Sequence, residues 1–237
     1  FPILAEFDNY VGPGSSITLL NNRPEDERQR ELAAKVPAPK NVAVRHMTGE
    51  FTSRALMERV QPQRYPTVMV LGDAAGEEES DTRAIIALLL LRDFRQRAGI
   101  AEQKVCSEIL DPKNRELAAT TEIRDVVISN VMVSMVLAQV TYEPRIRAVL
   151  EDLFQSEGSE VYIKDLALYV PLGQPTTFEH LVLAARARGE SAMGIQIYEN
   201  DAEKRYGFTL NPMGAARTTP FVPKPKDRLV VLAEDDG

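Results

Sequence analysis

The sequence predicts an α/β protein that begins with a doubly wound parallel sheet and ends in a small α+β lobe. Over residues 1–128, β-type runs alternate with helical patterns, and strands that alternate with helices are joined by right-handed crossovers. The run Thr67–Leu71 is apolar throughout, which is typical of a parallel strand buried on both faces. After residue 128 the pattern changes to two apolar helices and then to shorter segments. We therefore expect three parts, residues 1–128, 129–158 and 159–237.

The first part is expected to alternate strands and helices from its first residues. The first helix ends at Gly12-Pro13-Gly14, a flexible turn. The second helix can be capped by Asn22 and carries carboxylates in its first turn, where the helix dipole favours negative charge. The long helix that ends near Arg97 is expected to turn Ile85, Leu88, Leu89 and Phe94 inward. The expected strands are residues 16–21, 41–46, 67–71, 104–110 and 125–128, and the expected helices are residues 3–10, 24–35, 51–60 and 80–97.

The beginning of the chain is unusual. It opens Phe1-Pro2-Ile3, with no initiator Met and no basic-then-apolar signal region, and helical spacing starts at once. A chain that begins inside a helix and then enters an α/β alternation is expected to be a fragment whose preceding strand is missing.

Composition excludes several classes of protein. The net charge is −7 and the isoelectric point is near 5.1, which argues against a nucleic-acid partner because such proteins normally present a basic face. The single Cys106 rules out a disulfide framework within the chain and a cysteine-rich zinc site. The longest apolar run, Ala84–Leu91, is far shorter than the roughly 18–20 residues that span a bilayer, so we expect no membrane insertion of this chain.

Two adjoining apolar helices are expected after residue 128. Residues 130–140 are apolar on almost every side, and a helix of that kind is buried all round. A second helix begins after Pro144, carries one apolar stripe and closes at Glu157-Gly158. The pair is interpreted as a crossover that packs against a second subunit, and the alternative is burial within one subunit. The expected interface residues are Val131, Met132, Met135, Val136, Ile146, Leu150, Leu153 and Phe154.

The last part is expected to be a small α+β module of short segments. Thr176 and Glu179 form a capping box that opens a helix over residues 178–188, and Gly189 ends that helix. The expected strands are residues 161–163, 166–170, 192–198, 207–210 and 229–232.

Several motifs in register resemble the cytosolic part of CASTOR/POLLUX-type ion channels. They are Ser107-Glu108-Ile109-Leu110-Asp111-Pro112, Val127-Ile128-Ser129-Asn130, Val133-Ser134-Met135 and Val149-Leu150-Glu151-Asp152-Leu153-Phe154. The resemblance covers about residues 12–160, and Asp227-Arg228-Leu229-Val230-Val231 is similar to the small C-terminal lobe of RCK (TrkA-like) modules. It implies an RCK domain with a Rossmann-like lobe, a crossover that dimerises and a C-terminal lobe. It also implies a dimer that builds a tetrameric gating ring beneath a cation pore on the same polypeptide, at the cytoplasmic face of a membrane, with Ca²⁺ as regulatory ligand.

A nucleotide site is the first candidate at the carboxyl edge of the sheet. No Gly-x-Gly-x-x-Gly motif is present, and the strand that should end in an acidic residue for the ribose ends in Asn21-Asn22. Asn21, Asn22 and Asp73 are the candidate nucleotide-binding residues. The alternative, which we favour, is that Asn22 is a simple helix cap.

An acidic stretch at the same edge is the candidate metal site. Hard cations such as Ca²⁺ bind several carboxylate and carbonyl oxygens on a flexible loop, and open α/β sheets bind ligands at the carboxyl ends of their strands. The alternative, again favoured, is a solvated cap of the following helix. The candidate ligands are Glu77, Glu79, Asp81, Glu108 and Asp111.

Nothing in the sequence requires an enzyme. Cys106 lies in an apolar strand, His46 and His180 lack metal-ligand spacing, and no Gly-x-Ser-x-Gly or Walker motif occurs. The favoured function is a non-enzymatic, ligand-sensing regulatory domain of a cation channel. The alternatives are a nucleotide-binding regulator of a TrkA-like potassium uptake system and a remnant of an NAD-dependent dehydrogenase.

Overall fold

The computed structural model describes residues 2–35, 38–72, 76–100, 103–121, 125–155, 158–200 and 205–234. The chain divides into two compact units, Phe1–Pro144 and Arg145–Gly237, and each is described by itself. Helix α6 falls in the first unit and α7 in the second, while the expected three-part division stays a prediction.

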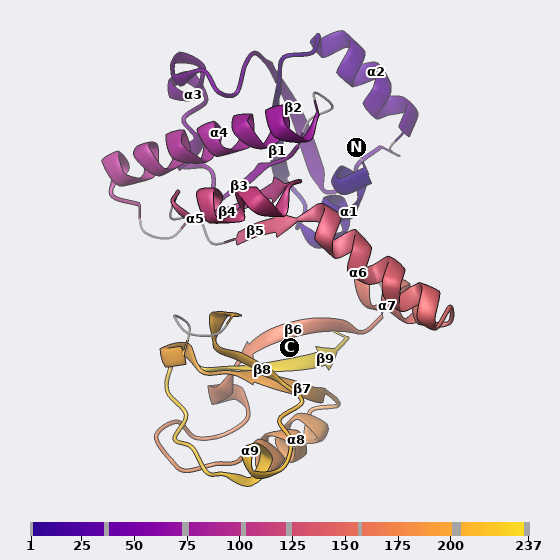
Figure 1. The fold of residues 1–237 in the computed structure, drawn as a ribbon, viewed down its shortest axis with the longest axis vertical. Helices are drawn as coiled ribbons and strands as arrows, with labels where there is room; N and C mark the ends of the chain where they lie inside the picture. The colour runs from indigo at the N-terminus through magenta and orange to yellow at the C-terminus, as the bar shows by residue number, and fades with distance from the viewer. Residues whose placement is uncertain are drawn as a thin grey trace. The chain divides into compact units, whose positions relative to one another are not determined.

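The first unit alternates helices and strands, and all of its described strand pairs are parallel (Figure 1). This confirms the α/β class and the order of elements. The elements are α1 (Pro2–Tyr10), β1 (Ser15–Asn21), α2 (Glu25–Lys35), β2 (Val42–Thr48), α3 (Arg54–Val60), β3 (Thr67–Val70), α4 (Glu77–Ala98), β4 (Lys104–Ile109), α5 (Arg115–Ala119), β5 (Asp125–Ile128) and α6 (Ser129–Tyr142).

The parallel strands form two sheets rather than one. β1 pairs with β2 from Ser15↔Val42 to Asn21↔Thr48, whereas β3, β4 and β5 form a second sheet in that order. Among the described strands, β1 and β3 are each hydrogen-bonded on one side alone.

Helix α4 supplies most of the core of the first unit. Leu88 and Leu91 are fully buried and pack in one cluster with Ile109 of β4 and Met57 of α3. The expected inward residue Leu89 is instead 38% exposed. The buried apolar positions of α4 form a broad stripe that runs from Ala84 to Phe94, and at about 100° per residue Leu89 lies just beyond the edge of this stripe.

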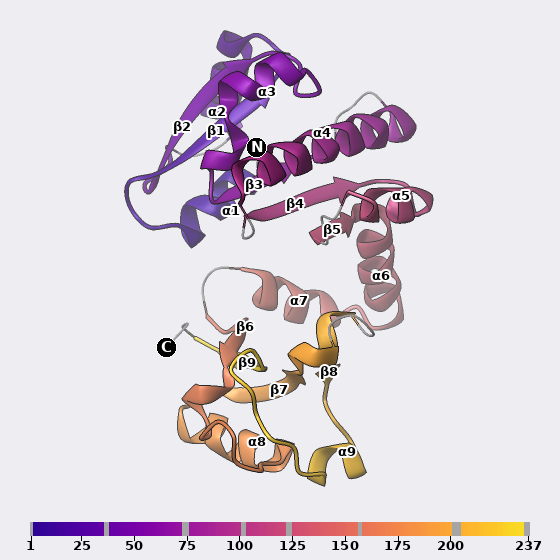
Figure 2. The same ribbon diagram turned by 90° about the vertical axis from the view of Figure 1, so that its left-hand side faces the viewer.

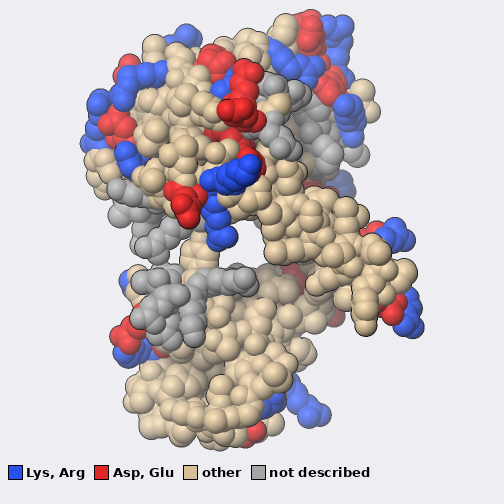
Figure 3. Space-filling model, in the orientation of Figure 1, with Lys and Arg blue, Asp and Glu red and all other residues tan. Residues whose placement is uncertain are grey.

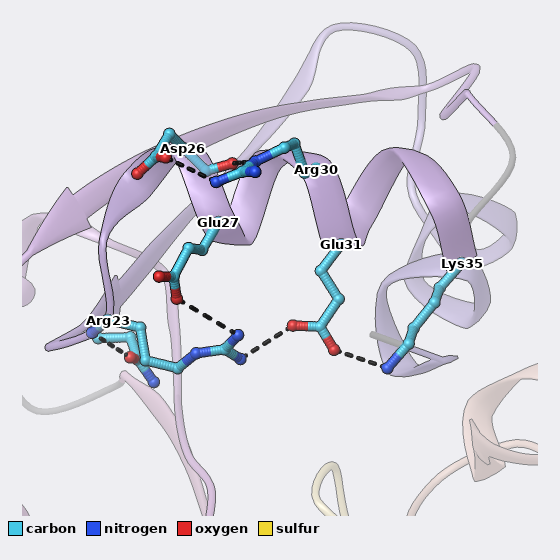
Figure 4. A network of polar contacts seen from close by, with 7 residues as sticks. Arg23, Asp26, Glu27, Arg30, Glu31 and Lys35 are labelled. Atoms are coloured by element: carbon cyan, nitrogen blue, oxygen red, sulfur yellow. Dashed lines mark hydrogen bonds and ion pairs between the residues drawn. The ribbon is translucent and has the colours of Figure 1, made fainter.

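Helix α2 is polar and is held by ion pairs along its exposed face (Figure 4). Arg30 contacts Asp26 at 2.8 Å, and Glu31 contacts both Arg23 at 2.9 Å and Lys35 at 2.6 Å. Exposed pairs of this kind contribute roughly 0.3–0.5 kcal/mol each, so the helix also needs an anchor to the sheet.

The second unit is an antiparallel sheet of order β6-β9-β7-β8 with a separate core. Leu181 of α8 packs in this core with Leu229 and Val231 of β9. Figure 2 shows α8 beside this sheet. The elements are α7 (Ile146–Phe154), β6 (Glu160–Asp165), α8 (Phe178–Ala187), β7 (Ser191–Gln196), β8 (Phe208–Leu210), α9 (Ala215–Thr218) and β9 (Arg228–Ala233).

Two expectations for this unit are wrong. Residues 166–170 form no strand, because the chain turns into a 3₁₀ helix at Leu166–Leu168. The N-cap of α8 is Thr177, whose hydroxyl accepts from the His180 amide, rather than Thr176. Thr176 is buried, and its backbone pairs with Phe221 in an isolated β-bridge, so it is not free to cap the helix.

Candidate functional site

Helix α6 exposes an apolar surface that its own unit does not cover. Not one of its 14 residues, Ser129–Tyr142, is buried. Met132 is 49% exposed, Met135 56% and Leu137 60%, and Figure 3 shows an almost uncharged surface over this helix. Exposed apolar side chains that adjoin in this way mark a protein interface more often than a free surface. The sequence predicts that this helix is buried on all sides, and the first unit does not bury it in this way.

The other expected interface residues show a similar pattern. Val131 and Val136 of α6 are half-buried, as are Ile146, Leu150 and Leu153 of α7, while Phe154 of α7 is 64% exposed. Both helices form where the sequence places them, although α7 begins at Ile146 rather than directly after Pro144. Dimerisation through them stays a prediction.

Asp81 binds backbone rather than facing an open crevice. Its side chain is 1% exposed, its Oδ1 accepts from the Leu110 amide at 2.8 Å, and its Oδ2 accepts from the Asp111 amide at 2.9 Å. The side-chain amide of Asn114 also donates to Oδ2, at 2.7 Å. Asp81 thereby fixes the turn after β4 onto α4.

The neighbouring candidate ligands are engaged in similar local contacts. Glu108 accepts from the Gly72 amide at 2.9 Å, and Asp111 accepts from the Lys113 amide at 2.9 Å as the cap of a short helix. Glu79 is exposed, whereas Asp73 and the side chain of Glu77 lie outside the described residues. Across the part of the chain that the structure describes, no group of three or more His, Cys, Asp or Glu side chains is placed to hold a metal ion. A Ca²⁺ site here stays a prediction.

The nucleotide candidates lie at the end of β1. Asn21 Oδ1 accepts from the Arg23 amide at 2.7 Å and shapes the turn into α2. Helix α2 begins at Glu25, so the residue directly before it is Pro24. Asn22 lies further upstream and is exposed, and the prediction that Asn22 caps this helix is therefore wrong. Nucleotide binding at Asn21, Asn22 and Asp73 stays a prediction.

Arg28 is a positioning residue that sequence reasoning missed. It is 3% exposed, and its guanidinium donates to the carbonyls of Leu19 and Met47 at 3.1 Å each and to Thr48 Oγ1 at 2.9 Å. Burial lowers the pKa of Arg28 below its usual value, and the negative charge of Glu25 acts in the opposite direction. Arg28 therefore anchors α2 to the carboxyl ends of both β1 and β2. The sequence feature that could have indicated this role is an arginine among the acidic residues at the start of a helix that follows a strand.

A second missed feature is a buried ionic cluster in the second unit. Lys164 Nζ and Arg188 Nε each lie 3.2 Å from Glu190 Oε1, and Tyr169 donates its hydroxyl to Glu190 Oε2. Burial opposes ionisation of Glu190, but hydrogen bonds from Tyr169, Lys164 and Arg188 outweigh it and lower its pKa. Burial first, and then the hydrogen bond to Glu190, raises the pKa of Tyr169 above its ordinary value.

The residues that are chemically suited to catalysis come from different elements. Cys106 is half-buried on β4, and His46 is half-buried on β2, in the other sheet. His180 lies in α8 of the second unit.

Comparison with known proteins gives relatives that are ion channels. No family model matches the chain. Ion channel CASTOR of Lotus japonicus is 28% identical over 99% of this chain and 30% of the relative. Ion channel DMI1 of Medicago truncatula is 30% identical over 79% of this chain and 25% of the relative, and ion channel POLLUX of Lotus japonicus is 30% identical over 79% and 24%. The chain thus spans less than a third of the length of these relatives.

These sequence matches identify the chain as a relative of one region of these ion channels. Its homologues are, more narrowly, the CASTOR/POLLUX ion channels. A solved structure of the GsuK channel, covering 94% of this chain and 37% of that one, matches at 13% identity with a TM-score of 0.38. Among the described residues, no helix has both the length and the apolar character needed to cross a membrane.

Proposed function

We propose that this chain is a cytosolic, ligand-sensing regulatory domain of a cation channel related to CASTOR and POLLUX, and that it is not an enzyme. The similarity to named ion channels over up to 99% of the chain supports this function. A ligand controls such a domain by binding one conformation more tightly than another, so the domain needs moving contacts rather than catalytic groups.

The surface of α6 is the observation that carries the proposal. A regulatory ring requires each domain to present an apolar face to another copy, and α6 leaves Met132, Met135 and Leu137 about half exposed. We propose that α6 and α7 form the dimer interface and that dimers build a tetrameric ring attached to a pore domain of the same polypeptide.

The oligomeric state tests this interface. Met135→Asp places a charge in the proposed contact, so it should turn a dimer into a monomer in sedimentation at tens of micromolar. Leu183→Asp is the matched control, because Leu183 of α8 is 62% exposed and the substitution adds the same charge outside α6 and α7. A wild-type monomer, a Met135→Asp dimer or equal dissociation by both variants would contradict the interface.

Electrical recording tests the regulatory function itself. In the polypeptide that carries this domain together with its pore, Met135→Asp should leave ion conduction intact and change the ligand dependence of open probability. Leu183→Asp should leave that dependence unchanged. Turnover of a nicotinamide substrate that disappears in Cys106→Ser or His46→Ala would instead support an enzyme.

A further inference from the structure

The turn that follows β4 is held by hydrogen bonds from two different helices. Its first residue, Leu110, donates its amide to Asp81 Oδ1 at 2.8 Å, and its carbonyl accepts from the side-chain amide of Asn130 at 3.0 Å. Asp81 belongs to α4 and Asn130 to α6, and both β4 and β5 lie between them in the sequence. A single residue therefore joins two helices that are far apart along the chain.

On the side of α4 the turn is firmly attached. Asp81 is 1% exposed, and its Oδ2 accepts from the Asp111 amide at 2.9 Å and from Asn114 Nδ2 at 2.7 Å. Asp111 in turn caps the short 3₁₀ helix Pro112–Asn114 by accepting from the Lys113 amide. Moving Asp81 away would leave buried donors unpaired, which is costly. A displacement of Asp81 therefore moves the turn with it.

On the side of α6 the attachment continues the pairing of β4 with β5. The ladder between these strands ends at the pair Ile109↔Ile128, and the chain then enters the turn on one side and α6 on the other. Where the backbone ladder has ended, Asn130 supplies one more hydrogen bond from its side chain to the Leu110 carbonyl. The base of α6 is thus bonded to the residue that Asp81 holds.

The acidic edge of the sheet adjoins this connection. The candidate carboxylates Glu77 and Glu79 precede Asp81 in the first turn of α4. At the end of β3, the Gly72 amide donates to Glu108 Oε2 at 2.9 Å, and a Cβ on Gly72 would lie 3.1 Å from the same oxygen. The end of β3 is therefore packed closely against β4, and a ligand at this edge would bear on the beginning of α4.

We propose that Asp81 and Asn130 are positioning residues that couple the carboxyl edge of the sheet to α6 through Leu110. A shift at the beginning of α4 moves the turn after β4 and changes how firmly the first turns of α6 are held. This inference rests on the proposed function and deepens it, because α6 carries the proposed dimer surface. A ligand changes that surface only through contacts that differ between two conformations, and the bond from Asn130 to Leu110 is such a contact.

Amide hydrogen exchange in α6 tests this coupling without a ligand or a pore. Exchange under native conditions reports local opening. The amides of residues 133–137 are the first in α6 with a carbonyl of the same helix four residues earlier. The samples are wild type, Asp81→Asn, Asn130→Ala and the double variant.

Asp8→Asn is the matched control. The Asp8 carboxylate also accepts from three N–H groups of the first unit, at distances of 2.8, 2.8 and 3.0 Å. These groups belong to the residues at the amino end of β2, and none belongs to the turn after β4 or to α6. The donors are the backbone amides of Lys40, Asn41 and Val42. The control therefore loses comparable bonds without touching Leu110 or Asn130.

The proposal expects Asp81→Asn to speed exchange at residues 133–137 by about tenfold, because an NH₂ group replaces one of the two acceptor oxygens. Asn130→Ala should speed it by a similar factor. The double variant should exchange little faster than either single variant, since both break one connection. Asp8→Asn should stay within about twofold of wild type.

Three results would overturn the coupling. They are unchanged exchange in Asp81→Asn, equal acceleration by Asp8→Asn, and single effects that multiply in the double variant, as they do for independent sites. None of these results bears on whether the chain regulates a channel, which sedimentation and electrical recording decide separately. Failure of the coupling is therefore distinguishable from failure of the proposed function.

Discussion

Asp81 shows how a carboxylate can resemble a metal ligand in sequence and support the fold in structure. Three N–H groups, from Leu110, Asp111 and Asn114, converge on its buried side chain. Buried carboxylates with this many donors stabilise loops, because removing the acceptor leaves the donors unpaired. Variants at Asp81 therefore report on folding before they report on any ligand.

Calcium binding at the acidic stretch is best tested at the exposed Glu79. We propose weak binding, with dissociation constants of about 10⁻⁴–10⁻³ M because no preformed cage is described. Calorimetry should show that Glu79→Gln and Glu77→Gln weaken it. Asp81→Asn should lower the free energy of unfolding by about 2 kcal/mol in urea, whereas Glu79→Gln should not. If the wild type and both glutamate variants bind Ca²⁺ with equal affinity, or if none binds at millimolar Ca²⁺, the proposal is contradicted. These carboxylates then serve only as a solvated cap of the helix.

Glu190 should make the second unit sensitive to acid. Its side chain is 6% exposed beside Lys164, and its pKa in the folded state is lowered from 4.5. A lowered folded pKa contributes stability that is fully present above the unfolded pKa and is lost as pH falls through the folded value. Glu190→Gln should therefore cost about 3 kcal/mol of unfolding free energy at pH 7, where it removes the carboxylate charge beside the buried Lys164, and clearly less near pH 3.

Urea unfolding at the two pH values measures this difference. The exposed Glu116→Gln is the control and should change stability little at either pH. A cost for Glu190→Gln that stays constant from pH 7 to pH 3 would show that the carboxylate charge is not what stabilises the cluster.

At the scale of the element, β7 depends on a glycine. A Cβ on Gly194 would lie 2.6 Å from the Thr209 carbonyl of β8 and 2.9 Å from Leu210, and the register with β9 shifts between Ala192 and Gly194. Gly194→Ala should therefore destabilise the second unit by about 1–3 kcal/mol in thermal or urea unfolding. Gly12→Ala is the control, since nothing lies within 4 Å of the added Cβ. Equal stability of the two variants would mean that β8 moves away at little cost.

Elements were predictable from sequence where local pattern decides them. The β1, β3, β4 and β5 spans agree within a residue or so, because apolar runs and turn residues mark them. Thr176 and residues 166–170 were wrong because distant partners decide there: Phe221 pairs with Thr176, and Leu166 donates its amide to the Asp227 carbonyl. The contacts of Arg28 and the Lys164–Glu190 pair were missed for the same reason. Arg28 lies 19 residues from Met47 in the sequence, and Lys164 lies 26 residues from Glu190.

At the scale of the whole molecule, the two units have separate cores and should unfold separately. One core is built around Leu88 and Ile109, the other around Leu181 and Val231. Calorimetry should resolve two transitions, and Gly194→Ala should lower the midpoint of one of them alone. A single transition that shifts as a whole would show that the units unfold cooperatively.

The junction of β5 and α6 has a mechanical consequence. The strand ends at Ile128 and the helix begins at Ser129, with no linker between them, and Asn130 donates its side-chain amide to the Leu110 carbonyl at 3.0 Å. A helix of 14 residues is about 21 Å long. With its base fixed in this way the helix acts as a lever, and a tilt of about 5° at the sheet displaces its far end by about 2 Å. A small rearrangement at the carboxyl edge of the sheet is thereby amplified along the apolar helix.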